Sequence, residues 1–268
     1  MTELTPPHRI EKLQIHAWWF TALLIGINVG LFAWQIISGV NITDPSSIDA
    51  IAWGADFTPL TFSGQPERLF SSMFFHFGMI HLMLNMWALY IFGGVAEQLF
   101  GRIYYIGMYF LAGLMGSVLS SYISIRDGYA LLQNFDPSHL PHISAGASGA
   151  VMGLGAALTV ISLFPALPQQ RFLLDKKSLL MIMAINLAFG FTVSGINNAA
   201  HIGGMIMGVL LASAWYVSQK HSSKKIIQTL ALVFATILLF SFYFYCTKLS
   251  AGLNPLWHEI LRQNQFSF

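Results

Sequence analysis

The sequence predicts an all-α membrane protein, a polytopic helical bundle, and two observations lead to this fold class. First, 55% of the 268 residues are hydrophobic and only 9% are charged, whereas a typical soluble domain has about 25% charged residues. Second, the apolar residues gather in long runs, and a helix needs about 20 such residues to cross the hydrocarbon core of a bilayer. The seven runs cover residues 16–37, 73–94, 103–124, 144–164, 178–193, 198–218 and 226–248.

The first run predicts a permanent membrane helix. It lacks the basic start and the small-residue cleavage site of a removable signal peptide, and an acidic loop follows it. With a cytoplasmic N-terminus, the inner segments hold nine of the thirteen Lys and Arg residues and the outer segments hold four. Because cytoplasmic loops are enriched in Lys and Arg, we expect a cytoplasmic N-terminus and an outer C-terminus.

Three loops between the runs are long enough to notice. The outer loop 38–70 mixes Trp53, Phe57 and Phe62 with acidic residues, a combination that suits the membrane interface, so we expect it on or in the headgroup layer. The outer stretch RDGYALLQNFDPSHLPHI precedes the fourth run, and the inner stretch PALPQQRFLLDKK precedes the fifth. The tails are too short for a soluble domain, and we therefore expect the functional residues within the bundle.

The second run carries polar side chains that a lipid-facing helix would lack. His81 and Asn85 are four residues apart and share one helical face, and His76 precedes them. Polar side chains inside a bilayer are functional candidates because each must find a partner. Two plainer interpretations stay open: Asn85 could join two helices, and His76 could lie at the interface.

The fourth and sixth runs carry glycines at helical spacing. Gly149 and Gly153 are four residues apart in the fourth run, and Gly204 and Gly208 are four apart in the sixth. Small residues at this spacing allow two helix backbones to approach closely. We therefore expect these two helices to pack against each other.

That packing would bring Ser148, at the start of the fourth run, within reach of His201 in the sixth. A serine hydroxyl becomes a useful nucleophile when a base such as histidine takes its proton. The free N–H groups and dipole of the helix start, with donors from His81 and Asn85, would stabilise an oxyanion. Gly146 would let a substrate backbone or the loop come close. Taken singly, Ser148 could merely bond to a neighbouring carbonyl, and the glycines could serve packing alone.

The sequence lacks the residues that other classes of intramembrane protease need. No H-E-x-x-H string occurs, so a metalloprotease is not expected. An aspartyl protease needs two intramembrane carboxylates, whereas Glu97, at an inner margin, is the only candidate. The single cysteine, Cys246, excludes an internal disulfide. We expect no metal, no cofactor and no nucleic-acid partner.

Three short strings, in this order and on separate runs, resemble the rhomboid family of intramembrane serine proteases. They are H-x-x-x-N at residues 81–85, G-x-S-G at 146–149 and A-H-x-x-G at 200–204. The likeness runs from the outer stretch WGADFTPLTFSGQPERLF to the end of the sixth run, and Arg68 and Glu97 also stand where that family tends to carry them. One departure is Met152, where several bacterial members carry a tyrosine that packs on the catalytic histidine.

The resemblance implies a six-helix protease core at residues 16–218, preceded by a short cytoplasmic tail, residues 1–15. Residues 219–268 would add a basic cytoplasmic loop, a seventh membrane helix and a short external tail. The site would be a dyad of Ser148 and His201 without a third carboxylate, with an oxyanion site formed by the Ser148 backbone N–H, His81 and Asn85. No cofactor is implied.

The resemblance also implies substrates that are themselves transmembrane helices. They would enter sideways near the fifth run, under the loop GFTVSGINNAA, in what we expect to be a bacterial inner membrane. The oligomeric state stays open. Two rival functions remain: a transporter or proton-coupled channel that uses His76, His81, Asn85 and His201 as a relay, and a rhomboid-like protein that binds membrane clients without cutting them.

Overall fold

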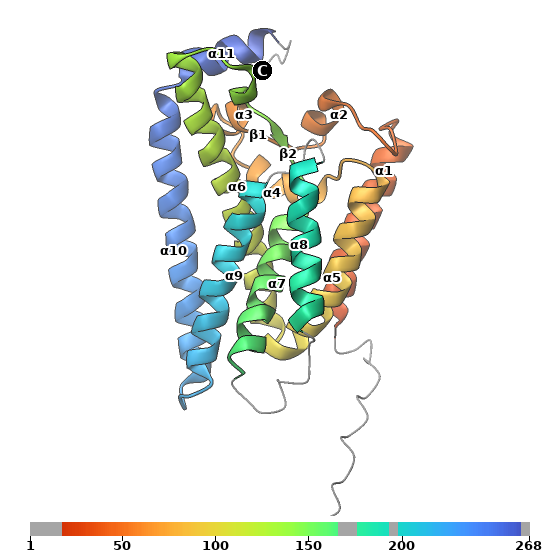
Figure 1. The fold of residues 1–268 in the computed structure, drawn as a ribbon, viewed down its shortest axis with the longest axis vertical. Coiled ribbons are helices and arrows are strands. Elements are labelled where there is room, and N and C mark those ends of the chain that lie inside the picture. The colour runs from red at the N-terminus through yellow and green to blue at the C-terminus, as the bar shows by residue number, and fades with distance from the viewer. Residues whose placement is uncertain (1–17, 166–175, 193–197, 264–268) are drawn as a thin grey trace, which may run out of the picture.

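A computed structural model describes residues 18–165, 176–192 and 198–263. The chain is a bundle of long helices (Figure 1), and short elements gather at one end of it, which we call the loop end. The elements of the loop end are α2 (Ser47–Ala52), β1 (Asp56–Phe57), α3 (Thr58–Phe62), β2 (Ile143–Ser144) and α11 (Asn254–Gln263). The expected tail 1–15 lies outside the described residues.

Seven long apolar helices follow the order of the seven predicted runs. Those long enough to cross a membrane are α1 (Trp19–Ile37), α5 (Met79–Phe100), α6 (Arg102–Gln133), α9 (Asn198–Ser218) and α10 (Lys224–Ala251). Two are shorter, α7 (Ser148–Leu163) and α8 (Lys176–Thr192). The all-α polytopic fold is thereby confirmed, and the chain is an integral, multi-pass membrane protein.

The bounds of two predicted helices were wrong. The second run starts at residue 73, whereas residues 73–78 belong to the 3-10 helix η2 (Ser72–Phe74), which follows the short helix α4 (Arg68–Ser71), and to a short connection; α5 begins only at Met79. Gly78 precedes α5 with φ +87°, a conformation that ends helical geometry and that glycine adopts at little cost. The third run was predicted to end at residue 124, whereas α6 continues to Gln133. The added turns contain Arg126, Ala130, Leu131, Leu132 and Gln133, which are good helix formers, although they do not form a long apolar run.

Helices α7 and α9 form the centre of the bundle and meet backbone to backbone. A Cβ atom at Gly204 would lie 3.2 Å from the Cα of Gly149, and one at Gly208 would lie 2.9 Å from the Cα of Gly153. Real Cβ atoms make ordinary contacts at 3.4–4 Å, so only glycine fits at these positions. Helix α6 packs against both α7 and α9, and α5 packs against α7.

Helices α1 and α10 lie at the periphery of the bundle (Figure 1). α10 packs beside α6 and α9 and exposes a broad apolar surface toward lipid, including Ile226, Phe234 and Phe240. α1 packs on α5, and its first turn is fixed by the buried carboxylate of Glu97. That carboxylate accepts hydrogen bonds from the backbone N–H of Thr21 at 2.8 Å and from its hydroxyl at 2.9 Å. A carboxylate at a helix N-terminus satisfies free N–H groups and the helix dipole.

The loop 38–70 is folded against the bundle. The guanidinium of Arg68 donates to the carbonyls of Ile51 and Ala55 at 2.8 and 2.9 Å, and so holds the loop's own backbone in place. Strand β1 pairs with β2, with Asp56 opposite Ser144. This pairing joins the loop to the segment that leads directly into α7.

The tail after residue 248 was predicted as a short external segment, but it contains a further helix, α11, which packs on α3. The Trp257 side chain is fully buried, lies against Gly128 of α6, and donates its indole N–H to the Ser250 hydroxyl at 2.9 Å. α11 therefore fastens the C-terminal segment to the loop end of α6.

Candidate functional site

The structure brings Ser148 and His201 together near the loop end of the bundle. Ser148 is the first residue of α7, and His201 lies in the first turn of α9. The distance between Ser148 Oγ and His201 Nε2 is 2.8 Å, and both side chains are buried. The close glycine contacts of α7 and α9 set this distance, because Gly149 directly follows Ser148 and Gly204 lies three residues, about one helical turn, after His201.

A serine hydroxyl that donates to an imidazole requires Nε2 to be unprotonated, which places the proton of a neutral His201 on Nδ1. Among the described residues, Nδ1 of His201 has no hydrogen-bond partner. No carboxylate of the described chain orients the ring as a third member would. Met152, where several family members carry a tyrosine, is fully buried in α7.

His81 and Asn85 lie on one face of α5 and line the same cavity as Ser148. The Nδ1 atom of His81 accepts the backbone N–H of Phe77 at 3.2 Å, so a neutral His81 carries its proton on Nε2. This Nε2 is buried and has no partner within the described part of the chain. Asn85 donates one amide N–H to the His81 carbonyl at 3.0 Å. Each side chain therefore retains a donor group that no described residue binds.

Gly146 makes the close approach of His81 possible. It has φ +121°, in the region that favours glycine, and its N–H donates to the Ser72 carbonyl at 2.8 Å. A Cβ atom at this position would lie 2.8 Å from Cε1 and 3.0 Å from Nε2 of the His81 ring. A side chain at residue 146 would therefore push the imidazole out of place.

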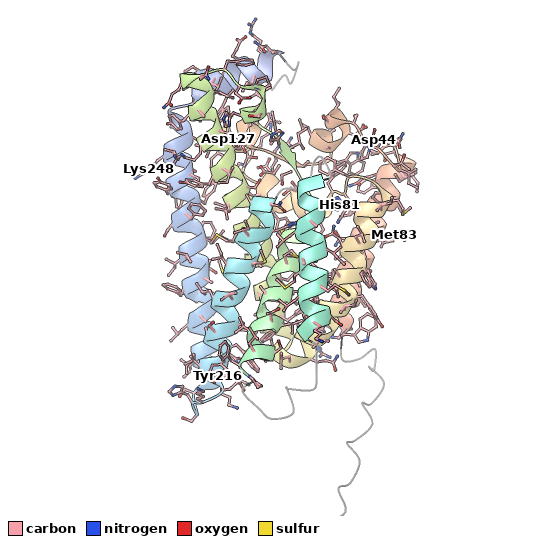
Figure 2. The ribbon with its side chains drawn as sticks, in the orientation of Figure 1. Asp44, His81, Met83, Asp127, Tyr216 and Lys248 are labelled. Atoms are coloured by element: carbon pink, nitrogen blue, oxygen red, sulfur yellow. The ribbon has the colours of Figure 1, made fainter. Side chains whose placement is uncertain are left out.

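The cavity lies between α5, α7, α8 and α9, and has a volume of about 30 Å³. This volume holds about two water molecules. Figure 2 shows His81 near the loop end, far from Tyr216 at the opposite end. The cavity is lined by His81, Leu84, Asn85, Trp87, Ser148, Ile182, Ile185, Asn186 and His201.

Asn186, on α8, is a cavity residue that sequence reasoning missed. It is an amide in an otherwise apolar run, the same signal that selected Asn85. Of the other residues considered, His76 lies before α5 rather than within it, and its Nε2 is 3.5 Å from the backbone N of Ala147. Arg68 and Glu97 lie outside the cavity lining, in the backbone contacts described above.

Within residues 18–165, 176–192 and 198–263, no cluster of three His, Cys, Asp or Glu side chains has the arrangement of a metal site. The substrate-entry loop expected at GFTVSGINNAA includes residues 193–197, which lie outside the described part.

Comparison with known proteins matches residues 63–220 to the Rhomboid domain, a stretch that includes every residue of the cavity lining. Rhomboid protease AarA of Providencia stuartii is 28% identical over 262 residues, which cover 91% of this chain and 90% of AarA. Rhomboid protease GluP of Bacillus subtilis (strain 168) is 31% identical over 226 residues; these cover 84% of this chain but only 40% of GluP. RHOMBOID-like protein 2 of Arabidopsis thaliana is 35% identical over 184 residues, 68% of this chain and 53% of that protein.

Proposed function

Since the chain belongs to the rhomboid family, we propose that it is an intramembrane serine endopeptidase with Ser148 and His201 as its catalytic dyad. The observation that carries the proposal is the 2.8 Å contact between the Ser148 hydroxyl and the His201 imidazole, in a cavity that also contains free hydrogen-bond donors. A nucleophile, a base and oxyanion donors are the groups that acyl transfer needs.

In the first half of the reaction, Ser148 Oγ attacks the carbonyl carbon of the scissile bond while His201 Nε2 takes the hydroxyl proton. The negative charge on the carbonyl oxygen is stabilised by the backbone N–H of Ser148, Nε2–H of His81 and the side-chain amide of Asn85. The N–H of Ser148 is available because the first N–H groups of a helix have no partner within the helix. His201 then gives its proton to the leaving amine, and an ester on Ser148 remains.

In the second half, a water molecule attacks the ester carbonyl, and His201 takes the proton of that water. The same donors stabilise the second oxyanion. The tetrahedral intermediate collapses, His201 returns the proton to Ser148 Oγ, and the new carboxyl terminus leaves. Each proton passes through the single nitrogen that contacts the serine.

The proposed substrates are transmembrane helices of other membrane proteins, in contact with the surrounding lipid. Such a helix would approach sideways beside α8 and would unwind locally near the outer membrane face, because a helical peptide bond is shielded by its own neighbours. We further propose a bacterial inner membrane as the location, with a cytoplasmic N-terminus, on the basis of the nine inner and four outer Lys and Arg residues.

The test is cleavage of a single-span substrate by the purified protein in liposomes, compared with Ser148→Ala. The variant is expected to lose activity by about a thousandfold or more, because the nucleophile is absent. A serine-directed fluorophosphonate is expected to label the wild-type protein and not the variant. Undiminished cleavage by Ser148→Ala would refute the nucleophile. Ion flux without cleavage would favour the channel or transporter, and binding without cleavage would favour the client-binding protein.

A further inference from the structure

The side chain of Asn186, on α8, lines the cavity together with residues of α5. Asn186, Ile182 and Ile185 line the cavity together, as expected for residues three and four positions apart on one helical face. The Asn186 side chain is half-buried. It belongs to the wall that a substrate helix would pass when it enters beside α8.

The bonding of this amide leaves it free to take a partner. Its Nδ2 donates one hydrogen bond to the Ile182 carbonyl one turn earlier, at 2.8 Å. Among the described residues this is the only bond of the Asn186 amide, so a second N–H and the Oδ1 atom remain. Asn85, on α5, lines the same cavity and is held in the same way, by the His81 carbonyl at 3.0 Å. Two amides, each fixed by its own helix, thus line the cavity that contains Ser148.

The neighbours of Asn186 indicate which partner it would take. The remaining lining of α5 and α8 is apolar, from Leu84, Trp87, Ile182 and Ile185, and suits apolar side chains of a substrate. An unwound segment also has backbone N–H and C=O groups that have lost their helical partners, and inside a membrane such groups must be satisfied by protein. A polar side chain facing a cavity within a membrane helix is a functional candidate for the same reason.

We propose that Asn186 is a substrate-binding residue, which hydrogen-bonds the main chain of the unwound segment beside the scissile bond. The inference rests on the proposed protease function and deepens it, because it assigns to α8 a part in holding the extended substrate. Asn85 serves the reacting carbonyl, whereas Asn186 serves a neighbouring peptide group. Binding by Asn186 does not depend on the identity of the substrate side chains.

The first test is Asn186→Leu, which keeps the approximate shape of the side chain and removes the amide. Loss of one hydrogen bond made equally in the bound substrate and in the transition state is expected to raise KM about three- to tenfold and to leave kcat unchanged. Labelling of Ser148 by a small fluorophosphonate is expected at the wild-type rate, because the probe has no peptide main chain. Met181→Leu, at an exposed position of the same helix, is the matched control and is expected to match the wild type.

The second test replaces single peptide groups of the substrate by esters, one position at a time around the scissile bond. An ester lacks the N–H donor and is a weaker acceptor, so at one position it is expected to lower kcat/KM several-fold for the wild type but not further for Asn186→Leu. Such non-additivity identifies a direct contact.

Three outcomes would overturn the inference: wild-type KM in Asn186→Leu, additive losses at every ester position, or slower fluorophosphonate labelling, which would indicate a structural role. Cleavage that persists in Ser148→Ala would instead refute the proposed function, so the two failures are distinguishable.

Discussion

Gly204→Ala is expected to inactivate the site through the packing of α7 on α9. The new Cβ atom would point at the Gly149 carbonyl group, with the carbonyl carbon 2.7 Å away. Backbone cannot rotate aside as a flexible side chain can, and overpacking of this kind costs about 1–3 kcal/mol. The two helices must therefore move apart near the residues that carry the dyad.

The size of the movement follows from the distances. Ordinary contact of a Cβ atom begins at 3.4 Å, so α7 and α9 must separate by at least roughly 0.7 Å at this point to clear the carbonyl carbon alone, and the carbonyl oxygen of Gly149 lies closer still. The distance between Ser148 Oγ and His201 Nε2, now 2.8 Å, would grow to roughly 3.5 Å, where a hydrogen bond is essentially lost. Misplacement of reacting groups by about 1 Å can lower a rate by about a hundredfold.

Two assays check this prediction: the rate of fluorophosphonate labelling at Ser148 and the rate of substrate cleavage, both with thermal unfolding in detergent as the measure of stability. Gly30→Ala is the matched control, because a Cβ at Gly30 of α1 has no atom within 4 Å; it is expected to be neutral or slightly stabilising. If Gly204→Ala labels, cleaves and unfolds as the wild type does, the claim that backbone contact sets the dyad distance is wrong.

Two further predictions concern the loop end. Burial raises the pKa of the Asp56 carboxyl to about 6 from 3.8, although Thr61, Ser121 and Arg68 each lower it. Between pH 4 and 6 the folded protein therefore keeps this proton, whereas the unfolded chain releases it, and the free energy of unfolding is expected to fall by about 3 kcal/mol as the pH rises from about 4 to above 6. Asp56→Asn should reduce this dependence of stability on pH, measured by thermal unfolding. An unchanged pH dependence would contradict the assignment. Trp257→Ala removes a fully buried ring and is expected to destabilise the protein by about 3–5 kcal/mol. Proteolysis within α11 should then be faster than in the wild type. Equal protease resistance of variant and wild type would show that α11 is held by other contacts.

Hydropathy predicted the number and order of the long helices because each must cover the thickness of a bilayer. It failed at the start of α5, where the apolar run extends back to Phe74 and Phe75 although the helix begins only after Gly78. It also failed for α11, whose Trp257, Ile260 and Leu261 follow the three-to-four spacing of an amphipathic helix. A criterion based on long apolar runs cannot detect so short and polar a helix.

The candidate site, too, could be predicted from the sequence only in part. The spacing of residues along the chain predicted that His81 and Asn85 share one helical face, and that the glycines of α7 and α9 allow these two helices to pack closely. The pairing of Asp56 with Ser144 had no signal in the sequence, because it joins two-residue strands that lie far apart along the chain. Asn186 carried a signal but no nearby motif, and only the structure brings α8 beside the cavity.

The contact between α7 and α9 also bears on which part of the bundle can give way when a substrate arrives. Where backbones touch directly, at Gly149 with Gly204 and at Gly153 with Gly208, there are no rotamers to exchange, and tightly packed interfaces resist gradual deformation. Ser148 and His201, the proposed nucleophile and base, lie on this rigid pair, whereas α8, which also lines the cavity, has no such pair of glycine contacts among its described residues. If the proposed function holds, we expect a substrate helix to enter by displacing α8 while Ser148 and His201 keep their alignment.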